Sequence, residues 1–402
     1  MTDFSFRPRT TLVLCALAAL LEGFDTQSMG VAAPRVIAEF GLATGQASAI
    51  FSATTFGLFL GAAIGGRVAD HIGRKQALIV SLLLFGLFSI LTSQSAGPNS
   101  LFAARLLTGL GLGGAMPNFI SLASESTRAE QRVSVVTMIM AAMPLGGACA
   151  ALVSLGGALG WGWRSIFYLG GTAPIALACL MHFLLPHSTV AAAPQPNLKP
   201  ARIDGVSQVL FAEGRASTTL LLWSGFFFTQ LVLLLMLNWL PSLIVGLGFT
   251  RAQASWAAVC FNLGGSLGSG FLGRLHAGEN RRRWVVVTYC GMAVALAAVA
   301  SVGKVFALAA LACALAGIFI VGAQLILFAL APLYYRSIIR GTGVGAAVAI
   351  GRLGSVFGPL FAGGLLALGG GSAAVLLAIV PFVAIGGCAA FALTWRPEAD
   401  GR

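Results

Sequence analysis

Four ionisable residues lie well inside long apolar segments of this 402-residue sequence, where they could do chemistry. They are Glu22 and Asp25 in the first such segment, Arg105 in the fourth and Arg352 in the eleventh. A charge at the centre of a bilayer costs about 2.5–3.5 kcal/mol, so each of these residues is predicted to face a protein interior and to have a partner or a task. Carboxylates can carry protons, and guanidinium groups bind carboxylates.

The two acids are three residues apart, which places them on one face of a helix. Because neighbouring carboxylates repel, one of them is predicted to hold a proton near neutral pH. Arg105 falls at about the depth of Asp25 and is the expected partner of the pair. Arg352 has no obvious protein acid and is therefore predicted to bind an anionic substrate. The alternative for Arg352 is a structural role, bonding loose backbone carbonyls.

The composition excludes a water-soluble globular protein. Apolar residues make up 58% of the chain and charged residues 9%, against about 25% charged in soluble domains. We predict an all-α integral membrane protein with twelve transmembrane helices, because each apolar segment can cross about 30 Å of hydrocarbon. The segments lie near 10–33, 46–66, 76–95, 100–123, 133–157, 163–185, 217–240, 253–273, 284–302, 305–333, 341–367 and 372–395.

The net charge of +12 has a membrane explanation. If the N-terminus is cytoplasmic, the large majority of the 24 Lys and Arg residues fall in cytoplasmic connectors and tails. The positive-inside rule then predicts that both termini are cytoplasmic. The other interpretation, a basic patch that binds nucleic acid, is disfavoured, and no nucleic-acid partner is expected.

The longest polar connector divides the twelve segments six and six. We therefore predict an N-terminal six-helix bundle at 1–185, a cytoplasmic linker at 186–216 and a C-terminal six-helix bundle at 217–402. Like features recur about 205 residues apart in the two halves, as with Pro34 and Pro241, and Arg128 and Arg336. Parallel halves with a binding site between them are typical of secondary transporters.

Residues 66–75 join the second and third segments and combine glycines, an acid and basic residues. Gly66 and Gly73 allow a tight turn, and Asp70 can meet a helix N-terminus or an arginine in one conformation only. This stretch closely resembles the signature loop of the major facilitator superfamily. The resemblance implies that Asp70 helps to lock the cytoplasmic side against the eleventh helix in the outward-open state. The predicted latch comprises Gly66, Asp70, Gly73, Arg74, Glu125 and Arg128.

The fourth segment is rich in glycine around Arg105 and resembles the fourth-helix motif of the same superfamily, in which the buried arginine is tied to proton coupling. Gly57-x-x-x-Gly61, Gly109-x-x-x-Gly113 and Gly354-x-x-x-Gly358 are typical of closely packed membrane helices. The stretch 264–268 matches the G-x-S-x-G pattern of esterases but lacks the strand that this motif needs. The seven cysteines form no C-x-x-C pair. We therefore expect no enzyme, metal site or cofactor.

Further polar side chains within the apolar segments are candidates for substrate binding. They are Gln27, Asn118, Gln230, Asn238 and Gln324. The aromatic residues Phe24, Trp223, Phe226, Phe227, Phe228, Trp239 and Phe328 could stack on an aromatic ring.

The whole chain resembles the aromatic acid:proton symporter family within the major facilitators. The residues that carry this resemblance are Glu22-Gly23-Phe24-Asp25, Pro117-Asn118 with Ser124-Glu125, Arg340 to Gly345, Gly351-Arg352-Leu353-Gly354 and Gly358-Pro359. Glu22, Gln27 and Asn238-Trp239-Leu240-Pro241 are similar to the branch that transports 3-(3-hydroxyphenyl)propionate. The resemblance implies proton-driven uptake of aromatic carboxylates across a bacterial inner membrane.

The expected function is thus proton-coupled symport of an aromatic carboxylic acid, such as hydroxyphenylpropionate or hydroxybenzoate, by alternating access. Glu22, Asp25 and Arg105 are the expected proton-coupling residues, and Arg352 is the expected substrate-binding cation. The expected partners of the protein are the substrate, protons and the lipid bilayer, and the chain is expected to act as a monomer.

Proton-linked efflux of amphipathic compounds is the alternative within transport. A membrane-embedded enzyme or sensor is the alternative from another class.

Overall fold

The computed structural model describes residues 8–128, 131–156, 162–185, 210–212, 214–275, 280–336 and 339–397. This part of the chain is helical, without a β-strand in the ranges just given. The connector predicted at 186–216 lies mostly outside it.

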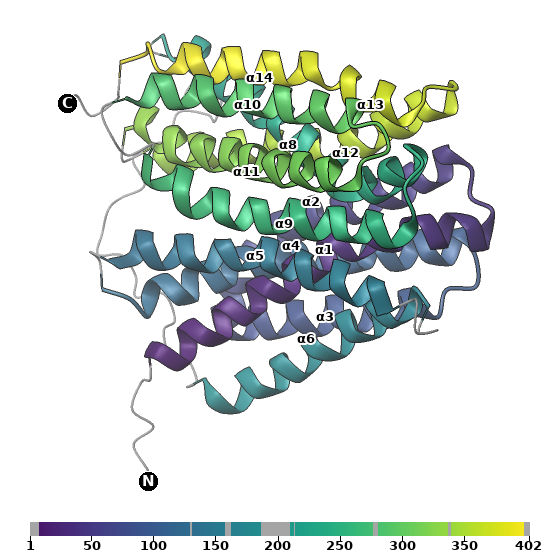
Figure 1. Ribbon diagram of the computed structural model, residues 1–402. Helices are drawn as coiled ribbons and strands as arrows, with labels where there is room; N and C mark the ends of the chain where they lie inside the picture. The colour runs from purple at the N-terminus through teal and green to yellow at the C-terminus, as the bar shows by residue number, and fades with distance from the viewer. Residues whose placement is uncertain are drawn as a thin grey trace.

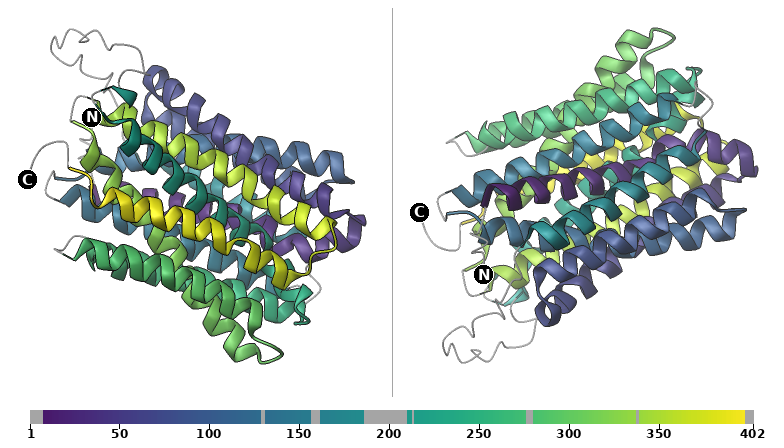
Figure 2. Two further views of the ribbon diagram at one scale, coloured as in Figure 1. Left: turned by 90° about the horizontal axis from the view of Figure 1, so that it is seen from above. Right: turned by 90° about the horizontal axis from the view of Figure 1, so that it is seen from below.

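The axes of the helices lie roughly parallel, and the helices end at two opposite faces (Figures 1 and 2). The first begins and the last ends on one face, here called the terminal face; the other is called the distal face. The helices are α1 (Pro8–Phe40), α2 (Thr44–Ile72), α3 (Arg74–Ser93), α4 (Pro98–Glu125), α5 (Arg132–Leu155), α6 (Arg164–Leu184), α8 (Ala216–Gly246), α9 (Arg251–Leu275), α10 (Arg281–Ser301), α11 (Phe306–Leu330), α12 (Arg340–Ala367), α13 (Ser372–Ala378) and α14 (Val380–Leu393). A short 3-10 turn, Ala331–Tyr334, extends α11.

Eleven helical spans in the described chain are long and apolar enough to cross a membrane, with α13 and α14 counted as one. They coincide with eleven of the predicted segments. The remaining segment, near 253–273, coincides with α9, a helix of 25 residues that packs against α5 and α11. An all-helical membrane fold is confirmed, and a twelfth crossing by α9 stays a prediction.

The helices pack as two groups. In the N-terminal group, α2 and α3 pack against α4, α1 against α5, and α3 against α6. In the C-terminal group, α8 packs against α12 and α14, and α11 against α9 and α10. The groups meet where α5 contacts α9, α2 contacts α12 and α1 contacts α8. Figure 1 shows the two groups one above the other.

Glycines allow the closest helix contacts within each group. A Cβ atom added to Gly109 of α4 would lie 2.0 Å from the carbonyl oxygen of Thr54 in α2. A Cβ atom on Gly354 of α12 would lie 2.1 Å from the carbonyl oxygen of Phe227 in α8. The predicted use of the G-x-x-x-G motifs in helix packing is confirmed, because backbones this close leave no room for a side chain.

A Gly109→Ala substitution is therefore expected to destabilise the protein by about 1–3 kcal/mol, because α2 and α4 must move apart to admit one methyl group. Thermal unfolding of the purified protein in detergent measures this effect. Gly364→Ala is the matched control, since a Cβ atom on Gly364 of α12 meets nothing within 4 Å. An equal effect of both substitutions would contradict the packing argument.

Several contacts between the two groups lie towards the distal face. Ser52 of α2 donates a hydrogen bond to the carbonyl oxygen of Val356 in α12 at 2.9 Å. The ring of Phe51 meets that of Trp239 in α8 at 5.1 Å between centroids. At the terminal face, Cβ atoms added to Gly341 and Gly345 of α12 would meet nothing within 4 Å. The described structure is thus closed towards the distal face.

Candidate functional site

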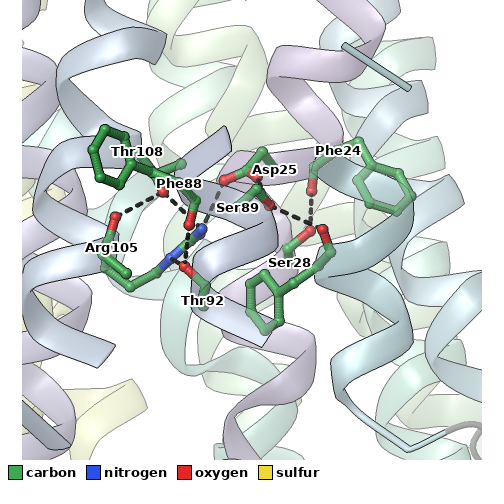
Figure 3. A network of polar contacts seen from close by, with 10 residues as sticks. Phe24, Asp25, Ser28, Phe88, Ser89, Thr92, Arg105 and Thr108 are labelled. Carbon is green, nitrogen blue, oxygen red and sulfur yellow. Dashed lines mark hydrogen bonds and ion pairs between the residues drawn. The ribbon is translucent and has the colours of Figure 1, made fainter. Parts of the chain in front are cut away.

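A buried ion pair joins α1 to α4 inside the N-terminal group (Figure 3). Nη1 of Arg105 lies 2.9 Å from Oδ1 of Asp25, and both side chains are 0% exposed. Ser89 of α3 donates its hydroxyl proton to Oδ2 of Asp25 at 2.7 Å. Both carboxylate oxygens therefore have a donor, as a buried charge requires.

The guanidinium group of Arg105 is held on its other sides as well. Its Nε donates to Oγ1 of Thr92 at 3.0 Å, and its Nη2 donates to Oγ1 of Thr108 at 2.9 Å. Its central carbon lies 4.8 Å from the ring centre of Phe167 in α6. Four helices of one group thus fix this charge, so it lies within the group rather than between the two groups.

The supporting residues of this network were missed by the sequence analysis. Ser89 and Thr92 are three residues apart on α3, which places both hydroxyl groups on the face that meets Asp25 and Arg105. The sequence feature that could have indicated them is the spacing of two hydroxyl residues, three apart, within one apolar segment. Serine and threonine are common in membrane helices, however, and their spacing does not identify the partner.

Glu22 does not belong to this network, which corrects the expectation that Arg105 serves both acids. Glu22 is 1% exposed, and its Oε2 has no hydrogen-bond partner in the described structure. Its charge interacts instead with that of Arg352 in the C-terminal group. A step of three residues rotates the side chain by about 60°, and this suffices to turn Asp25 into its own group and Glu22 towards the other.

Arg352 is half-buried on α12 and reaches across to the N-terminal group. Its Nη2 lies 3.4 Å from Sδ of Met116 in α4, a weak acceptor. Glu22 acts on it electrostatically, although no ion pair shorter than 4 Å joins the two in the described chain. The prediction that Arg352 has no protein acid nearby is therefore wrong, because α1 brings Glu22 close to it. Most of the guanidinium's donors remain available to an anion.

The five predicted polar candidates separate into two kinds. Three have their amide nitrogens engaged by backbone carbonyls: Gln27 with Leu237 of α8 at 3.0 Å, Asn118 with Gly114 at 2.7 Å and Asn238 with Leu234 at 2.8 Å. The other two are Gln230 and Gln324, whose amide oxygens have no partner in the described chain, and the amide oxygen of Gln27 has none there either. The first kind supports helix structure and packing, and the second is open to a ligand.

The residues of the predicted latch are only partly in contact. Arg74 and Glu125 form an ion pair at 2.8 Å that joins α3 to α4 at the terminal face. Gly73 has a φ of 85°, which a residue with a side chain rarely adopts, so a tight turn lies at Gly73, whereas Gly66 lies inside α2 and takes no part in it. Asp70 is exposed and forms no ion pair in the described chain, and Gly66 and Arg128 are also exposed.

This arrangement of paired helical groups with buried charges is typical of transporters, and sequence comparison agrees. The sequence profile of the Major Facilitator Superfamily matches residues 15–251, and the chain belongs to this superfamily. The chain is 42% identical to the 3-(3-hydroxyphenyl)propionate transporter of Escherichia coli (strain K12), over 98% of its own length and 95% of that protein's. It is 34% identical to the 4-hydroxybenzoate transporter PcaK of Pseudomonas aeruginosa, over 92% and 88% of the two chains.

The fold also matches solved structures. A D-xylose-proton symporter superposes with a TM-score of 0.78 at 18% identity, covering 97% of this chain and 98% of that one. The predicted resemblance to the superfamily and to transporters of aromatic acids is confirmed. So is the prediction of a multi-pass transporter rather than an enzyme, because the relatives are transporters by name.

Proposed function

We propose that this protein imports aromatic carboxylic acids together with protons across the inner membrane of a bacterium. The proposal includes twelve transmembrane helices, cytoplasmic termini and a functional monomer. It also divides the chain into two bundles, 1–185 and 217–402, that rock about a site between them. The terminal face is then cytoplasmic and the distal face periplasmic.

The single observation that carries this proposal is the relation between Glu22 and Arg352. In the described chain, Oε2 of Glu22 has no hydrogen-bond partner, and the charge of Glu22 acts across the interface between the groups on Arg352, whose guanidinium has one hydrogen bond, to Met116. A substrate carboxylate bound to Arg352 adds a second anion beside Glu22, and the two repel strongly in a medium of low dielectric constant. Binding a proton at Glu22 removes that repulsion. Substrate and proton therefore favour each other, which is the thermodynamic requirement for symport.

The Asp25–Arg105 pair has a different part in this mechanism. Its two charges are balanced, and each carboxylate oxygen and each guanidinium nitrogen has a hydrogen-bond partner within the N-terminal group. Asp25 is one helical turn from Glu22, so the pair fixes the rotation of α1 about its axis. We propose that Asp25 and Arg105 hold Glu22 at the interface between the groups. A change in the charge of Glu22 would then act on this pair by moving α1.

The closed distal face and the unpaired Asp70 support alternating access. In the described state, substrate and proton would leave towards the terminal face. Asp70 would find its partner on α12 in the opposite state, when the terminal face closes. Arg74 and Glu125 would keep the ends of α3 and α4 together throughout, as an ion pair within one group can.

The substrate class is supported by the relatives, whose names specify 3-(3-hydroxyphenyl)propionate and 4-hydroxybenzoate. Both compounds combine an aromatic ring, a carboxylate and a ring hydroxyl group. Arg352 supplies the cation that such a carboxylate needs.

Uptake of labelled 3-(3-hydroxyphenyl)propionate into proteoliposomes tests the proposal. With an inward proton gradient we expect accumulation above equilibrium that a protonophore abolishes. If no aromatic acid enters while everted vesicles expel lipophilic compounds, proton-linked efflux replaces the proposal.

An Arg352→Gln protein is expected to bind the aromatic acid about 10- to 100-fold more weakly, because a hydrogen bond to a charged group contributes about 1.5–3 kcal/mol. Arg352→Lys keeps the charge but not the planar guanidinium group, so its affinity for the acid should lie between those of the wild type and Arg352→Gln. Arg164→Gln is the control, since Arg164 forms an ion pair with Glu39 at the distal surface. Wild-type affinity in Arg352→Gln would assign this residue a structural role.

A further inference from the structure

Two buried glutamines of the C-terminal group have amide groups without a hydrogen-bond partner in the described chain. Gln324 of α11 is 7% exposed, and neither its Oε1 nor its Nε2 has a partner. Gln230 of α8 is 6% exposed, and its Oε1 has none. Each unsatisfied buried polar group costs about 1–3 kcal/mol, which an apolar side chain would avoid. Two such amides in one region therefore point to a ligand that satisfies them.

The two glutamines lie at the same level of the bundle, beside an aromatic pair. The rings of Phe226 in α8 and Phe328 in α11 meet edge to face, with centroids 5.3 Å apart. Gln230 follows Phe226 by four residues, and Gln324 precedes Phe328 by four. Because α8 runs towards the distal face and α11 runs away from it, both glutamines lie one helical turn distal to the ring pair.

This region adjoins the turn of α12 that carries Arg352. A Cβ atom on Gly351 would lie 3.3 Å from Cγ of Gln230 and 3.3 Å from Cβ of Phe226. The absence of a side chain at Gly351 lets this turn pack directly on α8. The expected carboxylate-binding cation and the unpartnered amides thus belong to neighbouring parts of one site.

The chemistry of the amides identifies the ligand group that suits them. A carboxylate only accepts hydrogen bonds, so it could engage Nε2 of Gln324 but would leave both Oε1 atoms unsatisfied. A phenolic hydroxyl group donates one hydrogen bond and accepts others. It can therefore donate to Oε1 of Gln230 and accept from Nε2 of Gln324, which engages both glutamines. An aromatic ring that carries this hydroxyl group can pack edge to face on Phe226 and Phe328.

We propose that Gln230 and Gln324 form a subsite for the ring hydroxyl group of the substrate, with Phe226 and Phe328 contacting the ring and Arg352 binding the carboxylate at the other end. This inference rests on the proposed function and assigns specificity within it. A site built to hydrogen-bond a hydroxyl group rejects the analogue that lacks it, because the polar groups of the site are then left unpaired.

Binding of two acids that differ only in this hydroxyl group tests the proposal. The probes are 3-(3-hydroxyphenyl)propionate and 3-phenylpropionate, titrated calorimetrically into the purified wild-type, Gln230→Met and Gln324→Met proteins. The wild type should prefer the hydroxylated acid by about 10-fold or more. Each variant should bind the hydroxylated acid about 10-fold more weakly, as the loss of one hydrogen bond predicts. Its affinity for 3-phenylpropionate should be unchanged or higher.

A Thr127→Val protein is the matched control, because Thr127 is a buried polar residue of the N-terminal group whose hydroxyl group already donates to the carbonyl oxygen of Ala123 at 2.8 Å. It should keep the wild-type preference. Equal weakening of both acids in the glutamine variants, or an unchanged preference, would overturn the subsite. If the wild-type protein binds neither acid, nor any other aromatic carboxylate, the proposed function itself is overturned, and that outcome is distinct from a lost preference.

Discussion

A Glu22→Gln protein is expected to lose proton-driven accumulation of the aromatic acid while keeping exchange of that acid across the membrane. The amide fills the same volume as a protonated carboxyl group and leaves Arg352 without its neighbouring anion. Substrate can then bind at any pH, but no proton is carried. The accumulation ratio in proteoliposomes should fall to about 1 under a proton gradient, and counterflow of labelled against unlabelled substrate should continue.

The comparison that makes this result specific is Glu39→Gln. Glu39 is an exposed acid at the distal end of α1, paired with Arg164 at 2.7 Å. Its substitution removes one negative charge from the same helix and should leave accumulation intact. If Glu22→Gln still accumulated substrate in response to a proton gradient, the assignment of Glu22 as the proton-binding group would be wrong.

An Asp25→Asn protein is expected to be less stable than the wild type by about 3–5 kcal/mol, because Arg105 stays buried without a counter-charge. Thermal unfolding in detergent should show this as a marked drop in the unfolding midpoint. Adding Arg105→Gln removes the orphaned charge, so the double variant should recover part of the loss.

The exposed pair of Arg74 and Glu125 supplies the control for this prediction. Its side chains are 46% and 48% exposed, and Glu125→Gln should change the stability by less than about 1 kcal/mol. Strictly additive losses from Asp25→Asn and Arg105→Gln would show that the two residues do not stabilise each other.

Much of the fold follows from local patterns in the sequence. Apolar segments of about twenty residues predict the helices, because a bilayer forces the backbone to bond within each segment. The contacts of Gly109 and Gly354 follow from their spacing, since a small residue every fourth position creates a groove on one helix face. Asp25 and Arg105 could be paired by their depth alone.

The rest depends on the rotation of each helix, which sequence spacing does not determine. Glu22 and Asp25 share a broad helix face, yet the boundary between the two groups passes between them. Gln324 and Asn118 are both buried amides, yet only Asn118 turns back to its own helix, at the carbonyl of Gly114. A shorter side chain reaches that carbonyl, and the longer glutamine extends away from the backbone.

Proton uptake on substrate binding tests the central claim most directly. Adding 3-(3-hydroxyphenyl)propionate to the purified protein in weakly buffered detergent solution, across roughly pH 6 to 9, measures protons taken up for each substrate bound. Because substrate binding favours the protonated form of Glu22, uptake should rise towards about one proton per substrate as the pH increases, while the affinity falls. The Glu22→Gln protein should take up none. Binding without proton uptake over this range, or equal uptake by wild type and variant, would contradict the coupling of Glu22 to Arg352.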